Sequence, residues 1–205
     1  NPLGGSTAIE LAGGTLKLTG VATTTANSLR AQLYYNNVYD ATKFLSFQNS
    51  DSILSQSPVQ TTIDTGLGNS NGPGINYNGN FQTLFQGMPS TDNFEVAWTG
   101  YLNAPATGSY QLTSYWADQA YVTYVDLNQN GAFEANERRW ESNAGGNAFG
   151  AFNLTAGQKY KVALGFAEFN GGENVGFRIY GPGTFNDQNV NPSLGTQAGM
   201  WSIID

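Results

Sequence analysis

The sequence predicts an all-β protein, an antiparallel β-sandwich or barrel with long surface loops. Helix signals are almost absent from its 205 residues. Short runs of alternating apolar and polar residues recur instead, and Gly, Asn and Pro bound these runs. Several such runs at even spacing are typical of antiparallel sandwiches and barrels. A chain of this length has room for one large β domain or two small ones.

The clearest strand signal lies in residues 94–102, where Phe94, Val96 and Trp98 alternate onto one face. Because alternation of this kind buries one face of a strand, we assign these three side chains to the core. A proline and a glycine in the stretch 103–108 then mark a turn. The same pattern predicts further strands at 109–116, 120–126, 148–154, 159–167 and 175–180.

The rest of the chain carries weaker signals. GGTLKLTG, at 13–20, predicts a short strand framed by glycines. Residues 50–93 are rich in Ser, Asn, Gly and Thr and show few strand signals. We therefore expect either a functional loop or an irregular excursion over the surface there. The chain ends near an apolar WSII, and we expect Trp201 to pack back onto the domain.

The composition excludes several classes of function. Acidic residues outnumber basic ones by 15 to 8, which argues against a nucleic-acid partner. No apolar run is long enough to span a bilayer, so we expect no membrane insertion. The absence of Cys and His excludes disulfides, cysteine nucleophiles, the Ser-His-Asp triad and the usual zinc sites. With only 11% charged residues, the surface is mostly neutral and polar, as in many extracellular β proteins.

An enzyme with this composition would depend on carboxylates or on a lysine. Glu168 and Glu173 are candidates for the paired carboxylates of a glycosidase, but nothing in the sequence fixes their separation. We therefore expect a protein that is not an enzyme and has no catalytic residues.

The segment 126–137 reads D-x-N-x-N-G-x-F-E-x-x-E, which is the ligand spacing of a calcium loop of the EF-hand type. The expected ligands are the side chains of Asp126, Asn128 and Asn130, the backbone carbonyl of Ala132, Glu134 directly or through water, and Glu137. Two asparagines replace the usual aspartates, so the expected dissociation constant is that of extracellular modules, on the order of 10⁻⁴–10⁻³ M.

The residues before this loop, 121–125, are too β-branched and aromatic for the helix of an EF-hand. We therefore expect structural calcium inserted into a β hairpin. The alternative is a hairpin with a type I′ turn at Asn130-Gly131, in which the charged groups are simply solvated.

Several strand-and-turn phrases occur in a fixed order along the chain. They are LRAQLYY at 29–35, VAWTGYL at 96–102, PATGSY at 105–110, SYWAD at 114–118, YVD at 124–126, LTAGQKY at 154–160 and VGFRIY at 175–180. Together they resemble the PA-14 domain (also written PA14), the β-sandwich of protective antigen, yeast flocculins and many bacterial adhesins and glycosidases. GGTLKLTG resembles the short β-strand repeats of autotransporter-type bacterial surface proteins.

The resemblance implies a ligand site. Sugar-binding members hold calcium with two consecutive aspartates joined by a cis peptide, a later loop adds an asparagine, and sugar hydroxyls coordinate the same ion. Here the pair falls on Asp118-Gln119, and the loss of one formal charge lowers the expected calcium affinity. The later loop maps to 168–174, where Asn170 matches the asparagine and Glu168 is its neighbour. The alternative is a plain turn and a glycine-rich hairpin.

Aromatic residues crowd the middle of the sequence. Exposed rings stack on sugar faces, whereas alternating rings fill a sandwich core. Trp116 and Trp140 flank polar loops, so both readings stay open for them, and we include Trp116 among the ligand-binding candidates.

These observations predict an extracellular calcium-binding carbohydrate-recognition or adhesion module of a bacterial surface protein, secreted to the cell surface. Its expected partner is a glycan or cell-surface carbohydrate, and we expect the isolated domain to be monomeric. Residues 1–28 would form an N-terminal strand segment of a larger surface protein, and 29–205 the PA-14-like sandwich. The alternative is a structural spacer that calcium stiffens and that binds no glycan.

Overall fold

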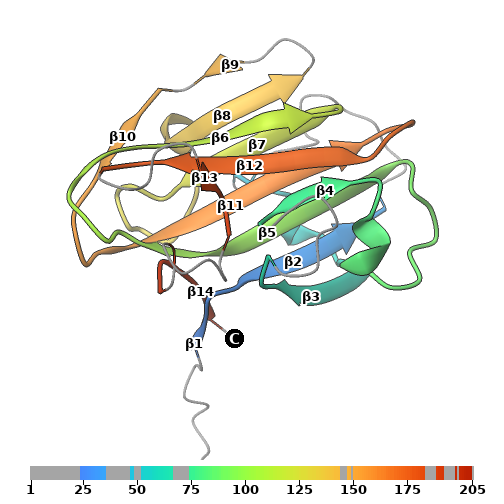
Figure 1. Ribbon diagram of the computed structural model, residues 1–205, viewed down its shortest axis with the longest axis horizontal. Helices are drawn as coiled ribbons and strands as arrows, with labels where there is room; N and C mark the ends of the chain where they lie inside the picture. Colours follow the sequence, from blue (N-terminus) through green and yellow to red (C-terminus); the bar gives the residue numbers. More distant parts are fainter. Residues whose placement is uncertain are drawn as a thin grey trace, which may run out of the picture.

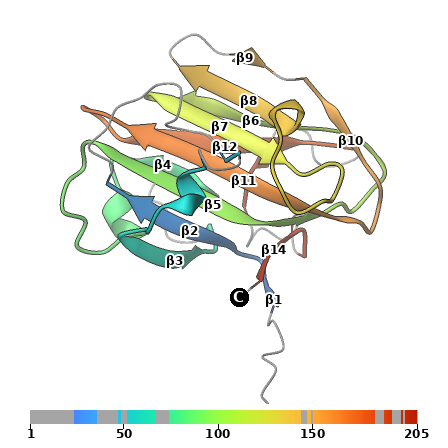
Figure 2. The same ribbon diagram turned by 180° about the vertical axis from the view of Figure 1, so that it is seen from behind.

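The computed structural model describes residues 24–35, 47–48, 52–66, 74–143, 147–148, 150–182, 188–191, 197 and 199–204. Within these residues every regular element is a strand or a short 3-10 helix. The strands form two antiparallel sheets, which Figures 1 and 2 show packed face to face as an open sandwich. The predicted all-β sandwich is confirmed. No helix in the described part of the chain is long and apolar enough to cross a membrane.

Among the described residues, the larger sheet has nine strands, with the main order β1-β14-β5-β11-β7-β8-β9. In addition, β2 pairs with β5, and β3 pairs with β2. The strands are β1 (Thr24–Ala26), β2 (Leu29–Tyr34), β3 (Gln60–Asp64), β5 (Phe94–Asn103), β7 (Ala120–Val125), β8 (Arg138–Asn143), β9 (Asn147–Ala148), β11 (Lys159–Glu168) and β14 (Trp201–Ile204).

The smaller sheet has five strands in the order β10-β6-β12-β13, with β4 paired to β12. Its strands are β4 (Asn76–Asn78), β6 (Gly108–Ala117), β10 (Phe152–Leu154), β12 (Asn174–Tyr180) and β13 (Gln188–Asn189). The 3-10 helices among the described residues are η2 (Ile53–Ser55), η3 (Phe81–Thr83) and η4 (Ala135–Glu137).

The main core lies between the two sheets. Phe94, Val96 and Trp98 are fully buried on the inner face of β5, as their alternation predicted. The Trp98 ring meets Phe177 of the smaller sheet edge-on, with ring centroids 5.7 Å apart. Phe81 of η3 closes one end of this core, 5.1 Å from the Phe94 ring. Each side chain of this kind contributes about 1.5–3 kcal/mol through burial, so this layer is the main source of stability.

A second set of buried residues, the outer cluster, covers part of the opposite face of the larger sheet. Gly165 makes room for it, since a Cβ there would lie 2.9 Å from the Phe47 ring. Phe47 in turn packs edge-on against Tyr124, at 5.7 Å between ring centroids. The outer cluster consists of Tyr34, Phe47, Ile53, Ala97, Val122, Tyr124, Phe133 and Ala163.

Most of the predicted strands are confirmed. Those expected at 94–102, 109–116, 120–126, 159–167 and 175–180 correspond to β5, β6, β7, β11 and β12. The single strand expected at 148–154 is wrong, because β9 and β10 are separate strands with different partners.

The weaker predictions have mixed outcomes. The stretch 50–93 contains β3, β4, η2 and η3, so it holds more order than its polar composition indicated. Trp201 is fully buried in β14, which confirms that the end of the chain packs back. The strand expected at 13–20 lies outside the described residues.

Asp64 places a buried carboxylate where β3, β4 and β5 meet. Its Oδ2 accepts hydrogen bonds from the Trp98 indole and the Tyr77 hydroxyl, each at 2.8 Å. Its Oδ1 accepts the Gly66 backbone N–H at 2.8 Å. Burial raises the pKa of Asp64, and these three hydrogen bonds oppose the rise. The carboxylate is thereby the hydrogen-bond acceptor for the polar groups of the buried Trp98 and Tyr77 rings.

We predict that Asp64→Ala lowers the free energy of unfolding by about 2–4 kcal/mol, because it leaves the buried Trp98 and Tyr77 donors without an acceptor. Chemical denaturation measures this value. Thr61→Ala, on the exposed face of the same strand, is the matched control and should change stability by less than about 0.5 kcal/mol. Equal effects of the two substitutions would contradict a bridging role for Asp64.

Candidate functional site

The 126–137 loop joins β7 to β8, which pair with each other in antiparallel register. This arrangement confirms that the loop is inserted into a β hairpin. The type I′ turn at Asn130-Gly131 is wrong, because twelve residues separate the strands and only Gly131 of the pair has a positive φ, at 85°. A positive φ at the sixth position is what the sharp bend of a calcium loop requires.

The two carboxylates at the ends of the loop hold its backbone. Asp126 accepts the N–H groups of Asn130, at 3.1 Å, and of Gly131, at 2.8 Å. Glu137 accepts the N–H of Leu127 at 2.7 Å, across the base of the loop. Asp126 and Glu137 are both about 98–99% buried, so these charges depend on the backbone donors that surround them.

Three further expected ligands contact one another inside the loop. The side-chain amides of Asn128 and Asn130 donate to the two carboxylate oxygens of Glu134, at 3.3 and 2.9 Å. The remaining one, Ala132, donates its N–H to the Asn130 side chain at 2.8 Å. These hydrogen bonds join the side chains of the loop to one another and to its backbone.

Phe133 fastens this loop to the sheet. Its ring belongs to the outer cluster and lies 5.6 Å from the ring of Tyr124. Lys161, on β11, places its ammonium 5.0 Å over the Phe133 ring and donates to the Gly131 carbonyl at 2.6 Å. Any change in the shape of the loop therefore reaches the packing on the outer face of the larger sheet.

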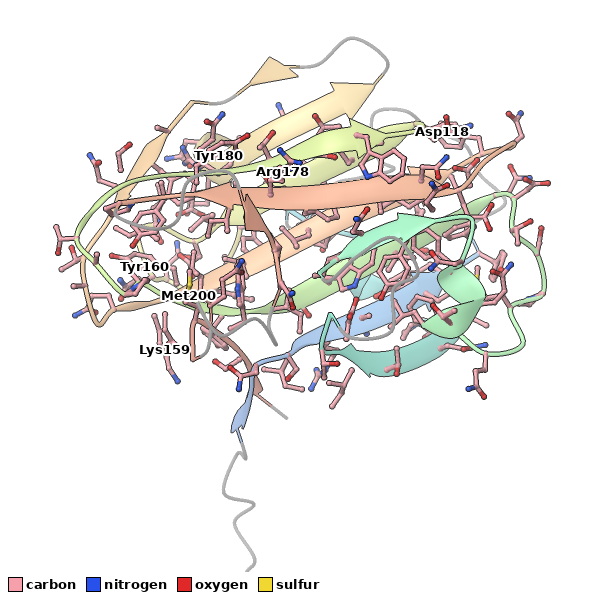
Figure 3. The ribbon with its side chains drawn as sticks, in the orientation of Figure 1. Asp118, Lys159, Tyr160, Arg178, Tyr180 and Met200 are labelled. Atoms are coloured by element: carbon pink, nitrogen blue, oxygen red, sulfur yellow. The ribbon has the colours of Figure 1, made fainter. Side chains whose placement is uncertain are left out.

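A second polar site lies at the other end of β7. Asp118 and Gln119 form the turn between β6 and β7, and Ala120 pairs with Ala167 near the end of β11. Figure 3 shows Asp118 at the margin of the sandwich, well away from β1 and the C-terminus that Figure 1 marks. We name Asp92, Asp118, Glu168 and Glu173 the acidic cluster, because the charges of Asp92, Asp118 and Glu173 each act on Glu168.

Glu168 is the central member of the acidic cluster. It is fully buried, and neither of its carboxylate oxygens makes a hydrogen bond. Burial, and then the negative charges of Asp118, Glu173 and Asp92, raise the pKa of Glu168 from its ordinary value of 4.5 to about 8. The Asn170 backbone N–H opposes this rise, but its approach falls short of a hydrogen bond.

Gln119 ties the two loops of this site together. Its Oε1 accepts the Phe169 N–H at 2.6 Å, and its amide donates to the Asn170 carbonyl at 2.8 Å. The cis peptide that the resemblance implies for this pair is absent, since the described peptide bonds are all trans. Both groups of the Gln119 amide are thus engaged with backbone, whereas the side chain of Asn170 is exposed.

Asp118 faces the glycines of the later loop. A Cβ at Gly171 or at Gly172 would lie 3.9 Å from Asp118 Oδ2, in ordinary van der Waals contact, so both glycines lie beside the carboxylate. Nearby, Asn174 carries a buried Oδ1 without a hydrogen-bond donor. No three acidic side chains of the described residues are arranged to hold a metal by themselves, so a cation here needs amide or backbone oxygens as well.

Trp116 is half-buried on β6, and its indole N–H donates to the Asn76 side chain at 3.2 Å. The ring is therefore fixed against β4 of the smaller sheet and keeps part of its surface accessible. The side chain of Trp140 lies outside the described residues.

Sequence reasoning missed Asp92. This residue stands two positions before β5, and the pairing of Phe94 with Glu168 brings it to the acidic cluster. Its carboxylate accepts the Gly171 N–H at 3.3 Å. An isolated aspartate in a polar stretch gives no signal of such a contact.

A sequence model of the PA14 domain matches residues 61–183, which is more than half of the chain. The chain belongs to the PA14 domain family. No curated protein sequence matches it. The residues before position 61 lie outside this match. They include β1 and β2 of the larger sheet, which pair with β14 and β5, respectively.

Solved structures share the fold of this PA14 domain at low sequence identity. The Epithelial Adhesin 6 A domain from Candida glabrata, in complex with Galb1-3GlcNAc, has a TM-score of 0.57 at 13% identity, over 91% of this chain and 90% of the adhesin chain. The PA14 domain of the antifreeze protein MpAFP has a TM-score of 0.55 at 11% identity, over 92% and 96%.

An anti-sigma factor domain-containing protein from Clostridium clariflavum is a further neighbour, with a TM-score of 0.49 at 13% identity. The match covers 84% of this PA14 domain and 46% of that protein, so this chain spans about half of its length.

We predict that the PA14 domain, in a buffer with EDTA, loses stability as the pH rises from about 4.5 to about 8. The folded state keeps the Glu168 proton up to a higher pH than the unfolded chain does, so unfolding is favoured as the pH rises through this window. Thermal melts at several pH values measure the slope.

Glu168→Gln should flatten that slope, because the buried group no longer ionises. Glu134→Gln, at an exposed position of the 126–137 loop, is the control and should keep the slope of the unmodified protein. Identical slopes for all three proteins would show that Glu168 ionises freely in the folded state.

Proposed function

We propose that this PA14 domain is an extracellular, calcium-binding carbohydrate-recognition or adhesion module of a bacterial surface protein, with the acidic cluster at its glycan site. One observation carries the proposal. The buried oxygens at this end, Glu168 Oε1 and Oε2 and Asn174 Oδ1, are all acceptors without a donor.

Buried polar atoms are nearly always satisfied, so three unfilled acceptors at one end indicate a missing partner. When Glu168 is ionised, the partner is a cation or a donor, since the three unfilled atoms then only accept. Hard oxygen ligands of this kind suit calcium, which takes six to eight oxygens from carboxylates, amides and carbonyls. A bound calcium would offset the repulsion among the carboxylates and offer free coordination positions to sugar hydroxyls.

The residues of this end have distinct roles in the proposal. Asp118 and Glu168 contribute the anionic oxygens, and Asn174 contributes an amide oxygen. Gln119 holds the 168–174 loop in position through its two backbone hydrogen bonds. The half-buried Trp116 offers a ring face beside the site, and such faces stack on sugars.

Two further facts support a glycan as the ligand. The Epithelial Adhesin 6 A domain, which shares the fold, is in complex with Galb1-3GlcNAc. The Asp118 end also lies away from β1 and β14, where the first and last described strands run side by side (Figures 1 and 3). The first and last described strands therefore leave Asp118 uncovered.

The 126–137 loop has a separate role in the proposal, as a structural calcium site. The proposed ligands are the side chains of Asp126, Asn128, Asn130, Glu134 and Glu137, with the carbonyl of Ala132 as the sixth. Its expected affinity, on the order of 10⁻⁴–10⁻³ M, fills the loop at the millimolar calcium of extracellular fluids and leaves it empty inside cells. This difference supports an extracellular location.

A structural spacer stiffened by calcium is the second candidate, and Gln119 favours it. Where the resemblance implies a second ligand aspartate, this chain has a neutral amide whose two groups are both bound to backbone. Calcium at the 126–137 loop would then be the functional ion, and no glycan would bind.

We predict that the PA14 domain binds a subset of glycans on an array in the presence of calcium and loses this binding in EDTA. Asp118→Asn should reduce calcium-dependent binding at least about tenfold, since one charged metal ligand is worth about 1.4 kcal/mol or more. The variant should keep the melting temperature of the unmodified protein, because Asp118 is exposed.

Glu137→Gln, at the far end of β7, is the matched control for glycan binding and should retain it at saturating calcium. An array with no bound glycan under any condition removes the carbohydrate-recognition proposal and leaves the spacer.

We predict that about 5 mM calcium raises the free energy of unfolding by about 1–2 kcal/mol through the 126–137 loop, as expected for a dissociation constant on the order of 10⁻⁴–10⁻³ M. Glu137→Gln should abolish most of this increase, because it removes a charged ligand and weakens the base of the loop. Differential scanning calorimetry with calcium and with EDTA measures the difference.

Asp118→Asn is the control for this measurement and should keep the larger part of the calcium-dependent stabilisation. If calcium stabilises the unmodified protein and Glu137→Gln equally, the loop does not bind calcium.

A further inference from the structure

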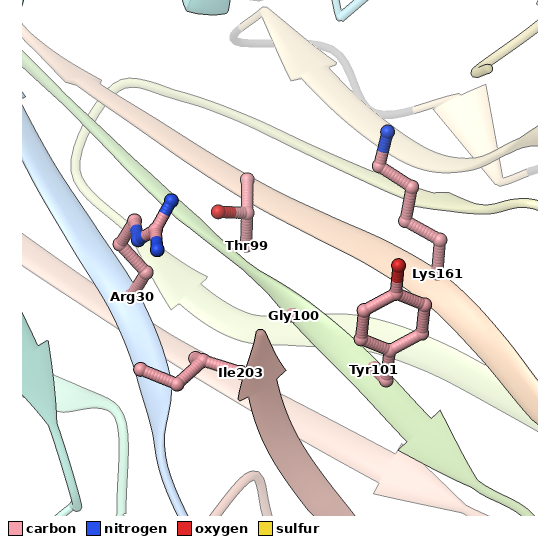
Figure 4. Close-up of a pocket in the computed structure, with 6 residues that line it drawn as sticks. All are labelled: Arg30, Thr99, Gly100, Tyr101, Lys161 and Ile203. Atoms are coloured by element: carbon pink, nitrogen blue, oxygen red, sulfur yellow. The ribbon is translucent and has the colours of Figure 1, made fainter. Parts of the chain in front are cut away.

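A pocket of about 140 Å³ opens on the outer face of the larger sheet (Figure 4). It lies near the start of β11, seven residues before Glu168, which corresponds to about 23 Å along the strand. It is therefore separate from the acidic cluster. Its lining residues are Arg30, Thr99, Gly100, Tyr101, Lys161 and Ile203.

The register of the sheet fixes the polar groups of this pocket. Arg30 of β2 pairs with Thr99, and Lys161 of β11 pairs with Tyr101, with β5 between them. Neighbouring strands lie about 4.8 Å apart, so the two basic residues stand on strands about 10 Å apart. Figure 4 shows Arg30 and Lys161 on opposite sides, with Thr99 between them and Tyr101 beside Lys161. Both long side chains therefore border the same pocket above β5.

The charge of the pocket is opposite to that of the molecule. The chain has a net charge of −7 and only eight basic residues, yet two of these line the pocket. Among the described residues, no aspartate or glutamate lines it. A paired cationic site on an acidic protein selects for a negative group, because other regions of the surface repel it.

The size of the pocket limits what it accepts. A volume of about 140 Å³ corresponds to four or five water molecules at about 30 Å³ each. Such a space holds a carboxylate or a sulfate and excludes the body of a large ligand. Guanidinium and ammonium groups are the usual partners of these oxyanions, and hydroxyls such as those of Thr99 and Tyr101 add hydrogen bonds.

We propose that this pocket binds the oxyanion group of an acidic ligand, a carboxylate or a sulfate, between Arg30 and Lys161. Arg30 makes a paired contact with two oxygens, and Lys161 adds a point charge from the opposite side. Lys161 already donates to the Gly131 carbonyl at 2.6 Å, which positions its ammonium and leaves two N–H groups for the ligand. The site is distinct from the proposed glycan site and does not depend on it.

The test is a titration of the ¹⁵N-labelled domain, followed by NMR, with sodium sulfate, sodium glucuronate and glucose. Sodium chloride keeps the ionic strength constant, so that general screening is the same throughout. We expect saturable shifts of the Gly100 and Tyr101 amides with sulfate, with glucuronate or with both, and none with glucose. The tighter anion identifies the group as a sulfate or a carboxylate. No saturable shift with either anion overturns the proposal.

Variants separate a specific pocket from diffuse attraction. Arg30→Gln and Lys161→Gln should each weaken anion binding roughly tenfold, which is the effect of one charged hydrogen-bonding partner. Lys159→Gln is the matched control, because Lys159 is exposed on the same strand and outside the pocket. It should weaken binding less than about twofold. An equal loss with Lys159→Gln and Lys161→Gln overturns the proposal, and melting temperatures confirm that each variant is folded.

Discussion

The ten-residue antiparallel pairing of β5 with β11 is the constraint on which the rest of the molecule depends. It runs without interruption from Phe94 opposite Glu168 to Asn103 opposite Lys159. β7 pairs with the other edge of β11, so the ends of β7 are fixed relative to both long strands. β2 and β14 share the remaining edge of β5, one beyond the other. The two ends of the β5–β11 ladder therefore position the acidic cluster, the 126–137 loop and the pocket between Arg30 and Lys161.

The pairing of β5 with β11 places the charges of the acidic cluster where they oppose folding. Glu168 lies in a strand whose other residues are mostly buried, and the ladder holds its carboxylate at the level of Asp92 and the 118–119 turn. A buried anion among other anions opposes folding unless a cation or a proton joins it. The rise of the Glu168 pKa to about 8 reflects the same unfavourable free energy of the buried charge. In contrast, the equally buried Asp64 is satisfied by three donors, so burial alone does not make a carboxylate a binding site.

The sequence predicted the long strands well and the contacts between them poorly. Alternation and the turn residues between the runs identified β5, β6, β7, β11 and β12, although β7 is buried along its whole length and β11 along most of it. It missed β3, β4 and β8, which are short or polar and owe their strand conformation to their neighbours. The 126–137 loop was recognisable because its expected ligands lie within twelve residues of sequence. Asp92 and the basic pocket were not, since Arg30, Tyr101, Lys161 and Ile203 come together only through a register that the sequence does not state.

The two candidate calcium sites stand at opposite ends of β7, about 20 Å apart for a six-residue strand. The 126–137 loop is anchored through Phe133 to the outer cluster, so its occupancy acts on packing and hence on stability. In the acidic cluster, Glu168 ends β11, whereas Asp92, Asp118 and Glu173 lie in loops, and Gln119 links the 118–119 turn to the 168–174 loop. A cation bound at the acidic cluster would change the core little. It would mainly change the groups that the loops present to a ligand. In this proposal, calcium at one end of β7 stiffens the sandwich, and the site at the other end of β7 recognises the ligand.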